Sequence, residues 1–204
     1  MPDVSVWYYG VSVAGAVNLE NRGGGQLARV AFERVDLGVC EQRDEILDIS
    51  MAYFQWMNDE IIARCKFSIP DIVGMSLDTY VSYTTDIGRR IGPNEGGVYV
   101  RRDDAGQIMA MGGIRRLPDG AAEIVRIFTR PQFRGMGLGT QAVDHLLTEA
   151  RQLGYGMVRL DTGVFMTSAH KIYHAAGFQL CEPYAGAEPP ERLLPYWLYL
   201  QRSL

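Results

Sequence analysis

Apolar side chains recur at helical spacing in the first half of the chain. From about residue 44 to residue 61 they fall every three or four positions, which predicts an amphipathic helix. Pro70-Asp71 and Ser76-Leu77-Asp78 have the residue types of helix starts, and the second of them leads into another helix towards Arg89. We therefore expect helices in succession before the first clear pair of strands.

Strand patterns frame these helices. A first strand is expected near residues 28–34. Residues 97–102 and 107–114 read as two strands joined by Asp103-Asp104-Ala105-Gly106, a good hairpin turn. After a further turn, residues 123–129 read as a central strand.

The C-terminal half alternates helix and strand. One apolar stripe begins at Thr140, and Gly154 supplies a C-cap for the helix that carries it. A strand at 157–161 and another helix follow. Two closing strands, at about 179–182 and 194–201, are joined by a proline-rich loop.

The chain length of 204 residues suits one domain with an appendage. The glycine run Gly23-Gly24-Gly25 resembles a junction, so we expect an N-terminal extension at 1–27 and the domain at 28–204. Apolar residues in the extension leave open whether it packs on the domain or is flexible.

The net charge and the cysteine content limit which binding partners and which cellular compartment we expect. A net charge of −4 gives no electrostatic case for nucleic acid or an anionic membrane as partner. Three scattered cysteines argue against a disulfide framework, and no apolar run approaches the length of a membrane span. A cytoplasmic setting is the expectation.

The most informative motif is Arg134-Gly135-Met136-Gly137-Leu138-Gly139, which lies between the central strand and the helix that begins near Thr140. Glycines let the backbone turn tightly and approach a ligand, while the unpaired N–H groups of a helix start point at an anion. The segment therefore has the form of a phosphate-binding loop.

Two other glycine-loop types fit less well. A Walker-type loop has Lys and then Ser or Thr after its last glycine, but Thr140 and Gln141 follow Gly139. A dinucleotide fingerprint has a third glycine two residues further on and opens the fold, whereas these glycines alternate strictly and lie late in the chain. A nucleotide-binding protein is thus the weaker alternative.

Arg-x-x-Gly-x-Gly after a strand resembles the acetyl-coenzyme A loop of the GNAT superfamily of N-acetyltransferases. Downstream, Tyr173-His174-Ala175-Ala176-Gly177-Phe178 is similar to the Tyr-x-x-x-Gly-Phe that ends the superfamily's last helix. The resemblance covers the C-terminal half well and the N-terminal half loosely. It implies a mixed α/β (α+β) fold with a largely antiparallel central sheet of about six to seven strands and about four helices.

The resemblance also implies how the cosubstrate acetyl-coenzyme A would be held. Backbone N–H groups of the loop would bind the pyrophosphate, and central-strand backbone would pair with the pantetheine arm. The cofactor-binding residues expected in this way are Ile127, Thr129, Arg134, Gly135, Met136, Gly137, Leu138, Gly139, Thr140 and Ser168.

Two residues are candidates for the proton transfers. Tyr173 is the candidate general acid, because a phenol is protonated at neutral pH and can protonate a thiolate; an aromatic that only packs the helix is the alternative. Glu123 occupies the position of the superfamily's general base, although a solvated strand-end glutamate would look the same. Strict alternation would put Glu123 on one side with Ile127 and Thr129, and Arg126, a structural residue, on the other.

One position departs from the superfamily pattern. Three residues before Ala169 the superfamily often has Asn, but this chain has Met166, so Thr167 or Ser168 would have to cap the last helix. His170 and His174 have a spacing that can chelate a metal, but no third ligand is apparent, and we expect no metal.

The acceptor pocket is expected between the helices of residues 56–90 and the loop of residues 184–195. Candidate lining residues and charges there are Tyr80, Tyr83, Tyr184, Asp59, Glu60 and Asp86. The resemblance implies acetyl transfer from acetyl-coenzyme A to a primary amine of a small molecule or peptide, by direct attack on the thioester. The alternative is a catalytically inactive acyl-coenzyme A-binding regulatory module. The closing strands could also support a homodimer.

Overall fold

The computed structural model of the protein describes residues 31–89, 91–187 and 189–204. The extension predicted at residues 1–27 and the predicted domain boundary at residue 28 lie outside these described residues. Within them, the order of helices and strands follows the sequence pattern closely.

The strands of the described chain form one seven-stranded sheet in the order β1-β2-β3-β4-β5-β7-β6. All neighbouring pairs are antiparallel except β4 and β5, which are parallel. This confirms the mixed, largely antiparallel sheet. The strands are β1 (Glu33–Val35), β2 (Gly97–Arg102), β3 (Ile108–Arg116), β4 (Ala122–Thr129), β5 (Met157–Gly163), β6 (Gln179–Leu180) and β7 (Trp197–Ser203).

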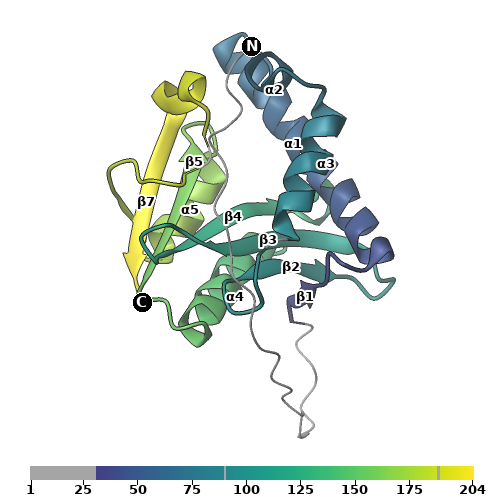
Figure 1. Ribbon diagram of the computed structural model, residues 1–204, viewed down its shortest axis with the longest axis vertical. Helices are drawn as coiled ribbons and strands as arrows, with labels where there is room; N and C mark the ends of the chain where they lie inside the picture. Colours follow the sequence, from purple (N-terminus) through teal and green to yellow (C-terminus); the bar gives the residue numbers. More distant parts are fainter. Residues whose placement is uncertain (1–30, 90, 188) are drawn as a thin grey trace, which may run out of the picture.

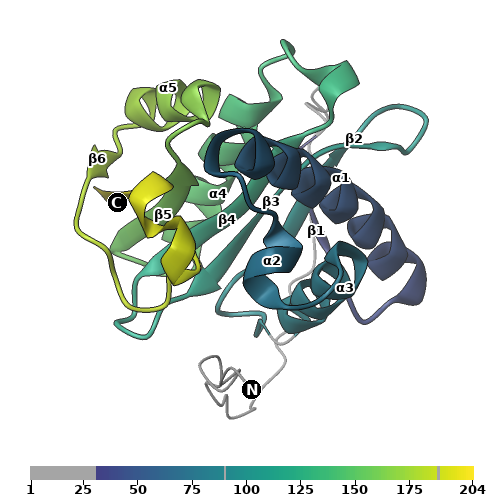
Figure 2. The same ribbon diagram turned by 90° about the horizontal axis from the view of Figure 1, so that it is seen from above.

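Helices cover both faces of this sheet. Figure 1 shows α1, α2 and α3 above β1–β4 and α4 below them, and Figure 2 shows the first three in front of the strands. α5 packs with α4 into one core. The helices are α1 (Cys40–Cys65), α2 (Ile69–Val73), α3 (Leu77–Gly88), α4 (Leu138–Gln152) and α5 (Thr167–Ala175), with 3-10 helices η1 (Pro131–Phe133) and η2 (Glu191–Tyr196).

Local chemistry explains several boundaries. α2 begins in a capping box, in which the Ser68 side chain accepts from the Asp71 N–H and the Asp71 carboxylate accepts from the Ser68 N–H. The last strand begins later than predicted, at Trp197, because residues 191–196 form the 3-10 helix η2 with Pro195 inside it. A proline ring restricts its own backbone and removes a strand donor, so the pattern at 194–196 is not extended.

The close seating of α4 on the sheet depends on a glycine in β3. A Cβ added at Gly112 would lie 2.8 Å from the Cδ1 of Leu146, which is fully buried. Only a residue without a side chain therefore lets the helix approach the strand at this point.

β4 and β5 pair over a short length and then separate. Their parallel register covers Ala122 with Val158 and Glu123 with Arg159. Figure 1 shows β5 and β7 turned steeply away from β2–β4. Beyond Glu123, β4 pairs only with β3 among the described strands, so its other edge is open to a cavity. None of the described helices has the length and apolarity needed to cross a membrane.

Candidate active site

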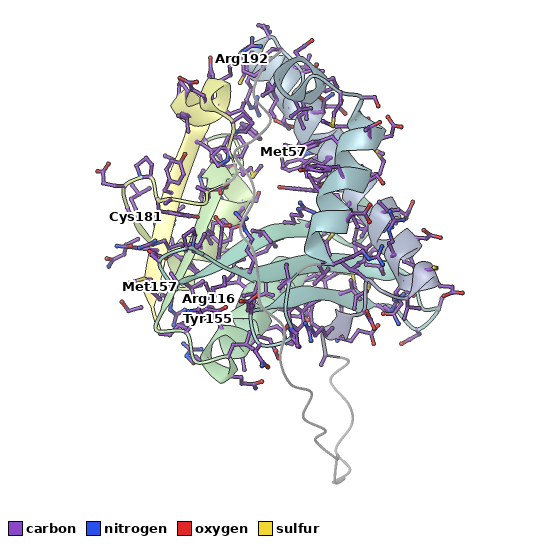
Figure 3. The ribbon with its side chains drawn as sticks, in the orientation of Figure 1. Met57, Arg116, Tyr155, Met157, Cys181 and Arg192 are labelled. Atoms are coloured by element: carbon purple, nitrogen blue, oxygen red, sulfur yellow. The ribbon has the colours of Figure 1, made fainter. Side chains whose placement is uncertain are left out.

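A cavity of about 550 Å³ lies where β4 and β5 separate. Its floor is residues 124–129 of β4, and one end is formed by the glycine loop and the start of α4. The other end is walled by α1, α2 and η2; Figure 3 shows Met57 on the side of α1 that faces β5 and β7. The cavity thus joins the predicted phosphate-binding loop to the predicted acceptor end.

The glycine loop has the conformation that an anion-binding turn needs. Gly135 and Gly137 have φ values of 82° and 74°, which residues with a side chain rarely adopt. Gly137 is the N-cap of α4, no described side chain caps the helix, and the Gln141 N–H donates to the Gly137 carbonyl. The earlier N–H groups of the first turn therefore have no partner within the helix and suit a pyrophosphate.

The expected cofactor-binding residues gather around this cavity, with one exception. Met136 is 58 % exposed and does not line it. The lining residues among those expected are Ile127, Thr129, Arg134, Gly135, Gly137, Leu138, Gly139, Thr140 and Ser168. The glycine loop, the strand β4 before it and the downstream helix α5 therefore all contribute to one cavity.

Arg134 brings positive charge to the edge of the cavity. Its guanidinium carbon lies 5.8 Å from the ring centre of Trp56 and 5.9 Å from that of Phe128. Its Nε donates to the Thr129 carbonyl at 3.3 Å. These contacts hold the guanidinium beside the glycine loop, where it favours a phosphate.

Tyr173 lines the cavity from α5. Its ring packs edge-on against Phe178, with 6.0 Å between the ring centres, and its side chain is buried. Burial raises the pKa of its hydroxyl, and the negative charge of Asp161 raises it further. The phenol is therefore held protonated, as a general acid must be.

Glu123 lies outside the cavity lining. It is fully buried, and its carboxylate accepts from Arg115 Nε at 2.5 Å and from the Tyr184 hydroxyl at 2.9 Å. Burial and the Glu123 charge raise the pKa of the Tyr184 hydroxyl. Glu123 is thus an enclosed anchor for the loop that contains Tyr184, not a solvated strand-end residue.

The expectation that Arg126 faces away from Val125 is wrong, because a bulge interrupts β4; Ile127 packs on the α4 side of the sheet, whereas Arg126 contacts Phe54 of α1. Val125 pairs with Gly113 and Phe128 with Met111, so two β4 residues oppose Gly112 alone. Arg126 has a φ of 56° at this bulge and lines the cavity with its neighbours. An extra residue in one strand ends the simple alternation of faces.

Asp161 is a site residue that the sequence reading missed. It lies on β5, lines the cavity, and accepts a hydrogen bond from Trp197 Nε1 at 2.5 Å. Burial of the Tyr173 and Tyr199 hydroxyls is the larger cause of their raised pKa values, and the negative charge of Asp161 raises both further. The available signal was an acidic residue at the end of the strand predicted at 157–161.

The start of α5 differs from the expectation. Its N-cap is Met166, without a capping side-chain hydrogen bond, so neither Thr167 nor Ser168 caps it. The Met166 sulfur instead accepts from the Thr162 hydroxyl at 3.4 Å. His170 Nε2 is hydrogen-bonded to the Gly163 carbonyl, and the described residues contain no group of three potential metal ligands.

Residues of α1–α3 and of the segment that leads into η2 line the part of the cavity where the sequence predicts the acceptor, but most of the aromatic and charged residues expected there do not line it. Tyr80 lines it, whereas Tyr83 is 53 % exposed and Tyr184 contacts Glu123. The helix carboxylates Asp59, Glu60 and Asp86 are absent from the described lining; they contact Gln55, Arg64 and Arg43, respectively.

Comparisons with known proteins point in one direction. The family model described as "Acetyltransferase (GNAT) family" matches residues 44–178. An uncharacterized N-acetyltransferase of Schizosaccharomyces pombe is 34 % identical over 99 residues, which are 47 % of this chain and 60 % of that protein. The chain thus spans less than two thirds of this curated relative.

Solved structures share the fold at low sequence identity. An acetyltransferase of the GNAT family from Staphylococcus aureus has a TM-score of 0.61 at 13 % identity, covering 85 % of this chain and 99 % of that one. The Salmonella typhimurium protein yncA, solved with its cofactor acetyl-CoA, has a TM-score of 0.55 at 14 % identity, covering 87 % and 95 %. Both similarities concern the arrangement of helices and strands.

Proposed function

The chain belongs to the acetyltransferase (GNAT) family, and from this premise we propose that it transfers an acetyl group from acetyl-coenzyme A to a primary amine. The observation that carries the proposal is the cavity between β4 and β5, which runs from the left-handed glycine loop to Tyr173 and Asp161. Phosphate binding and proton transfer are thereby available along one continuous space.

The residues around the glycine loop fit acetyl-coenzyme A. First-turn N–H groups of α4 and the Arg134 guanidinium would hold the pyrophosphate, and the open edge of β4 at Ile127 and Thr129 would pair with the pantetheine arm. A Cβ at Gly135 would meet no atom within 4 Å, so the space beside the loop is available to a ligand. The relative solved with acetyl-CoA is consistent with this choice.

The reaction requires a balanced pair of proton transfers. The amine nitrogen attacks the acetyl carbonyl carbon, a C–N bond forms, and the C–S bond breaks with its electron pair leaving on sulfur. Asp161 takes the proton that the nitrogen loses, and the Tyr173 hydroxyl protonates the thiolate. Return of the proton from Asp161 to the tyrosinate restores both residues, so one amine hydrogen ends on the thiol.

We place proton removal on Asp161 because it lines the cavity, whereas Glu123 is enclosed by Arg115 and Tyr184. Glu123 would reach an amine only through water, and in this proposal it positions the loop. The Asp161 charge also raises the pKa of Tyr173, after the larger effect of burial. Protonation of Asp161 would remove that charge and make the tyrosine a better acid at the moment when it must act.

The test combines binding and turnover. We expect calorimetric titration to detect acetyl-coenzyme A binding, and a thiol-release assay with a broad amine panel to detect transfer. Gly137→Glu should abolish binding, because it puts a carboxylate where the pyrophosphate is expected. Gly154→Glu is the matched control, since Gly154 has a similar φ of 81° and no atom within 4 Å of an added Cβ.

Each outcome has a distinct meaning. Equal loss of binding in both variants would mean that the backbone strain, not the site, is responsible. Binding without turnover of any amine would contradict the enzyme and favour the regulatory module. Absence of acetyl-coenzyme A binding by folded wild-type protein would contradict both.

A further inference from the structure

Arg126 has an unusual environment for a cavity-lining cation. It sits at the β4 bulge with its guanidinium carbon 5.4 Å from the ring centre of Phe54. One nitrogen, Nη1, donates a long hydrogen bond of 3.4 Å to the Thr84 carbonyl. Its Nε is buried and has no hydrogen-bond partner among the described residues. The structure therefore leaves much of this guanidinium's donor capacity unused.

A buried donor without a partner is unfavourable, and the deficit is greater on a charged group. The ligand that best satisfies a guanidinium is a carboxylate, whose two oxygens match two of its N–H groups. Within the described chain no carboxylate forms an ion pair with Arg126, although nine arginine–carboxylate pairs are present there. The counter-ion can therefore come from a ligand in the cavity.

Arg126 is distinct from the arginine assigned to the cofactor. Arg134 lies beside the glycine loop and stacks over Trp56 and Phe128, whereas Arg126 faces Phe54 of α1 and Thr84 of α3. It therefore belongs to the wall formed with the N-terminal helices. This is the wall against which the acceptor is expected.

Among the described residues, the remainder of the acceptor end is largely apolar and includes the carboxylate of Asp161. Asp161 lines the same cavity from β5, and side chains from α1, α2, η2 and β7 line it as well. The apolar and aromatic residues of these walls include Tyr53, Phe54, Met57, Ile72, Leu193 and Trp197. Such walls favour an apolar body of aromatic or branched aliphatic type.

We infer that the acceptor is an apolar amino acid, whose carboxylate pairs with Arg126, whose side chain contacts the apolar wall, and whose amine faces Asp161. This rests on the proposed acetyl transfer and adds the class of acceptor. A purely cationic amine would leave Arg126 unsatisfied and would be repelled by it. A peptide N-terminus would lack a carboxylate beside its amine.

The first experiment compares three amines with the same phenyl body: phenylalanine, phenylalaninamide and 2-phenylethylamine. Thiol release gives kcat/KM for each with wild type, Arg126→Gln and Arg126→Lys. Comparing ratios between variants cancels the intrinsic difference in amine reactivity. Wild type should prefer the amino acid over its amide by about 10- to 100-fold, the worth of a charge-assisted hydrogen bond.

Arg126→Gln should lower the ratio of kcat/KM for the amino acid to that for the amide by about 10- to 100-fold relative to wild type, and Arg126→Lys should lower it less because charge remains without the planar fork. The backbone at residue 126 has a φ of 56°, and the strain of this conformation is similar for arginine, glutamine and lysine. Arg151→Gln is the matched control, since Arg151 is an exposed residue of α4 outside the cavity. It should keep the wild-type preference.

A second measurement decides the inference even if none of these amines reacts. Calorimetry with 3-phenylpropionate and 3-phenylpropanamide, in the presence of coenzyme A, compares a carboxylate with its neutral amide. Tighter binding of the acid by wild type, lost in Arg126→Gln, is the expected result. Equal binding of acid and amide, or the same preference in both proteins, overturns the inference.

The two proposals fail in different ways. If 2-phenylethylamine or the amide is acetylated as well as phenylalanine, acetyl transfer stands and the amino acid acceptor is wrong. If coenzyme A-loaded protein prefers the acid but no amine in a broad panel is acetylated, the anion subsite stands and acetyl transfer is wrong.

Discussion

Asp161 and Tyr173 face the same cavity and have complementary tasks in the proposed reaction. The carboxylate accepts a proton from the amine, and the phenol donates one to the thiolate. The Asp161 charge contributes, after burial, to the raised pKa of Tyr173. The two residues should therefore act as one unit rather than independently.

We expect Asp161→Asn and Tyr173→Phe each to lower kcat by about 10²- to 10⁴-fold, the usual worth of a positioned acid or base. The kcat of the double variant should be only slightly lower than that of the less active single variant. Acetyl-coenzyme A affinity should not change, because neither residue contacts the glycine loop in the proposal. Asparagine can still accept from Trp197 Nε1, and phenylalanine can still pack on Phe178.

Asp144→Asn, an exposed position of α4, is the control for loss of one negative charge. Steady-state kinetics and titration measure the two quantities. Multiplicative losses in the double variant would show that the residues act independently, and an unchanged kcat in Asp161→Asn would exclude it as the base.

The residues at the site were predictable where they belong to a compact motif. The glycine loop and Tyr173 are close in sequence to the elements that place them. Arg126 was assigned to the opposite face and Asp161 was not singled out, because the placement of both depends on the partner strands. A bulge against Gly112 changes the face of Arg126, and the separation of β4 from β5 leaves Asp161 at the cavity. A periodic pattern of apolar residues reveals neither the register of neighbouring strands nor the point at which two strands separate.

At the scale of elements, the contact of α4 with the sheet includes a histidine among aromatic rings. His145 stacks on Phe32 at 5.5 Å and meets Tyr99 edge-on at 5.0 Å between ring centres. Burial lowers the pKa of His145, although the charge of Glu149 partly opposes this. The folded protein therefore binds a proton here less readily than the unfolded chain does.

This gives a defined pH dependence of stability. The contribution of a neutral His145 is complete above its ordinary pKa of 6.5 and is lost as the pH falls from 6.5 towards the lower pKa of the folded state. The slope from one such group cannot exceed about 1.4 kcal/mol per pH unit. Urea unfolding between pH 5 and 8 should show this loss.

His145→Phe should reduce the acid sensitivity while keeping the ring contacts, since His145 Nε2 is buried without a hydrogen-bond partner in the described chain. His174→Phe, at an exposed position of α5, is the matched control and should follow the wild-type curve. An unchanged slope in His145→Phe would assign the acid sensitivity to other groups.

Element boundaries followed from local signals where those signals were strong. The hairpin of β2 and β3 and the C-cap region of α4 were read correctly from turn residues and apolar stripes. Residues 194–196, the second half of η2, were predicted as the start of a strand because their apolar residues match a strand pattern, while Pro195 and the turn before it favour a 3-10 helix. Neither Thr167 nor Ser168 caps α5, because the helix already begins at Thr167 and its N-cap is Met166.

At the scale of the whole molecule, the acceptor end joins two halves that are distant in sequence. The α1–α3 half contacts the β5–β7 half through Arg192, whose guanidinium lies 4.4 Å from the Phe67 ring centre, and through Arg64 over Phe165 at 5.5 Å. Figure 3 shows Arg192 at the end of the molecule near α2. The loop before η2 is tied to the sheet at its other end, where Arg115 Nη2 donates to the Gly186 carbonyl at 2.5 Å.

Tyr184 adds the second tie of this loop, through its hydroxyl to Glu123. Tyr184→Phe removes that hydrogen bond but keeps the edge-on contact with Tyr199 and the stacking with Arg159. Because a buried carboxylate loses a donor, we expect a stability loss of about 1–2 kcal/mol in urea unfolding. The same loop leads to Pro189, Pro190 and Leu193 of the acceptor wall, so acceptor KM should rise several-fold while acetyl-coenzyme A affinity is unchanged.

The control for this prediction is Tyr83→Phe, the same chemical change on an exposed side chain of α3. It should leave stability and KM at their wild-type values. A stability loss in Tyr184→Phe without a rise in acceptor KM would mean that the Glu123–Tyr184 contact stabilises the fold but does not shape the acceptor site. A rise in KM accompanied by weaker acetyl-coenzyme A binding would instead mean that the whole cavity had loosened. The expected pattern, with KM changed and cofactor affinity retained, identifies the loop as the part of the molecule that shapes the acceptor end independently of the cofactor end.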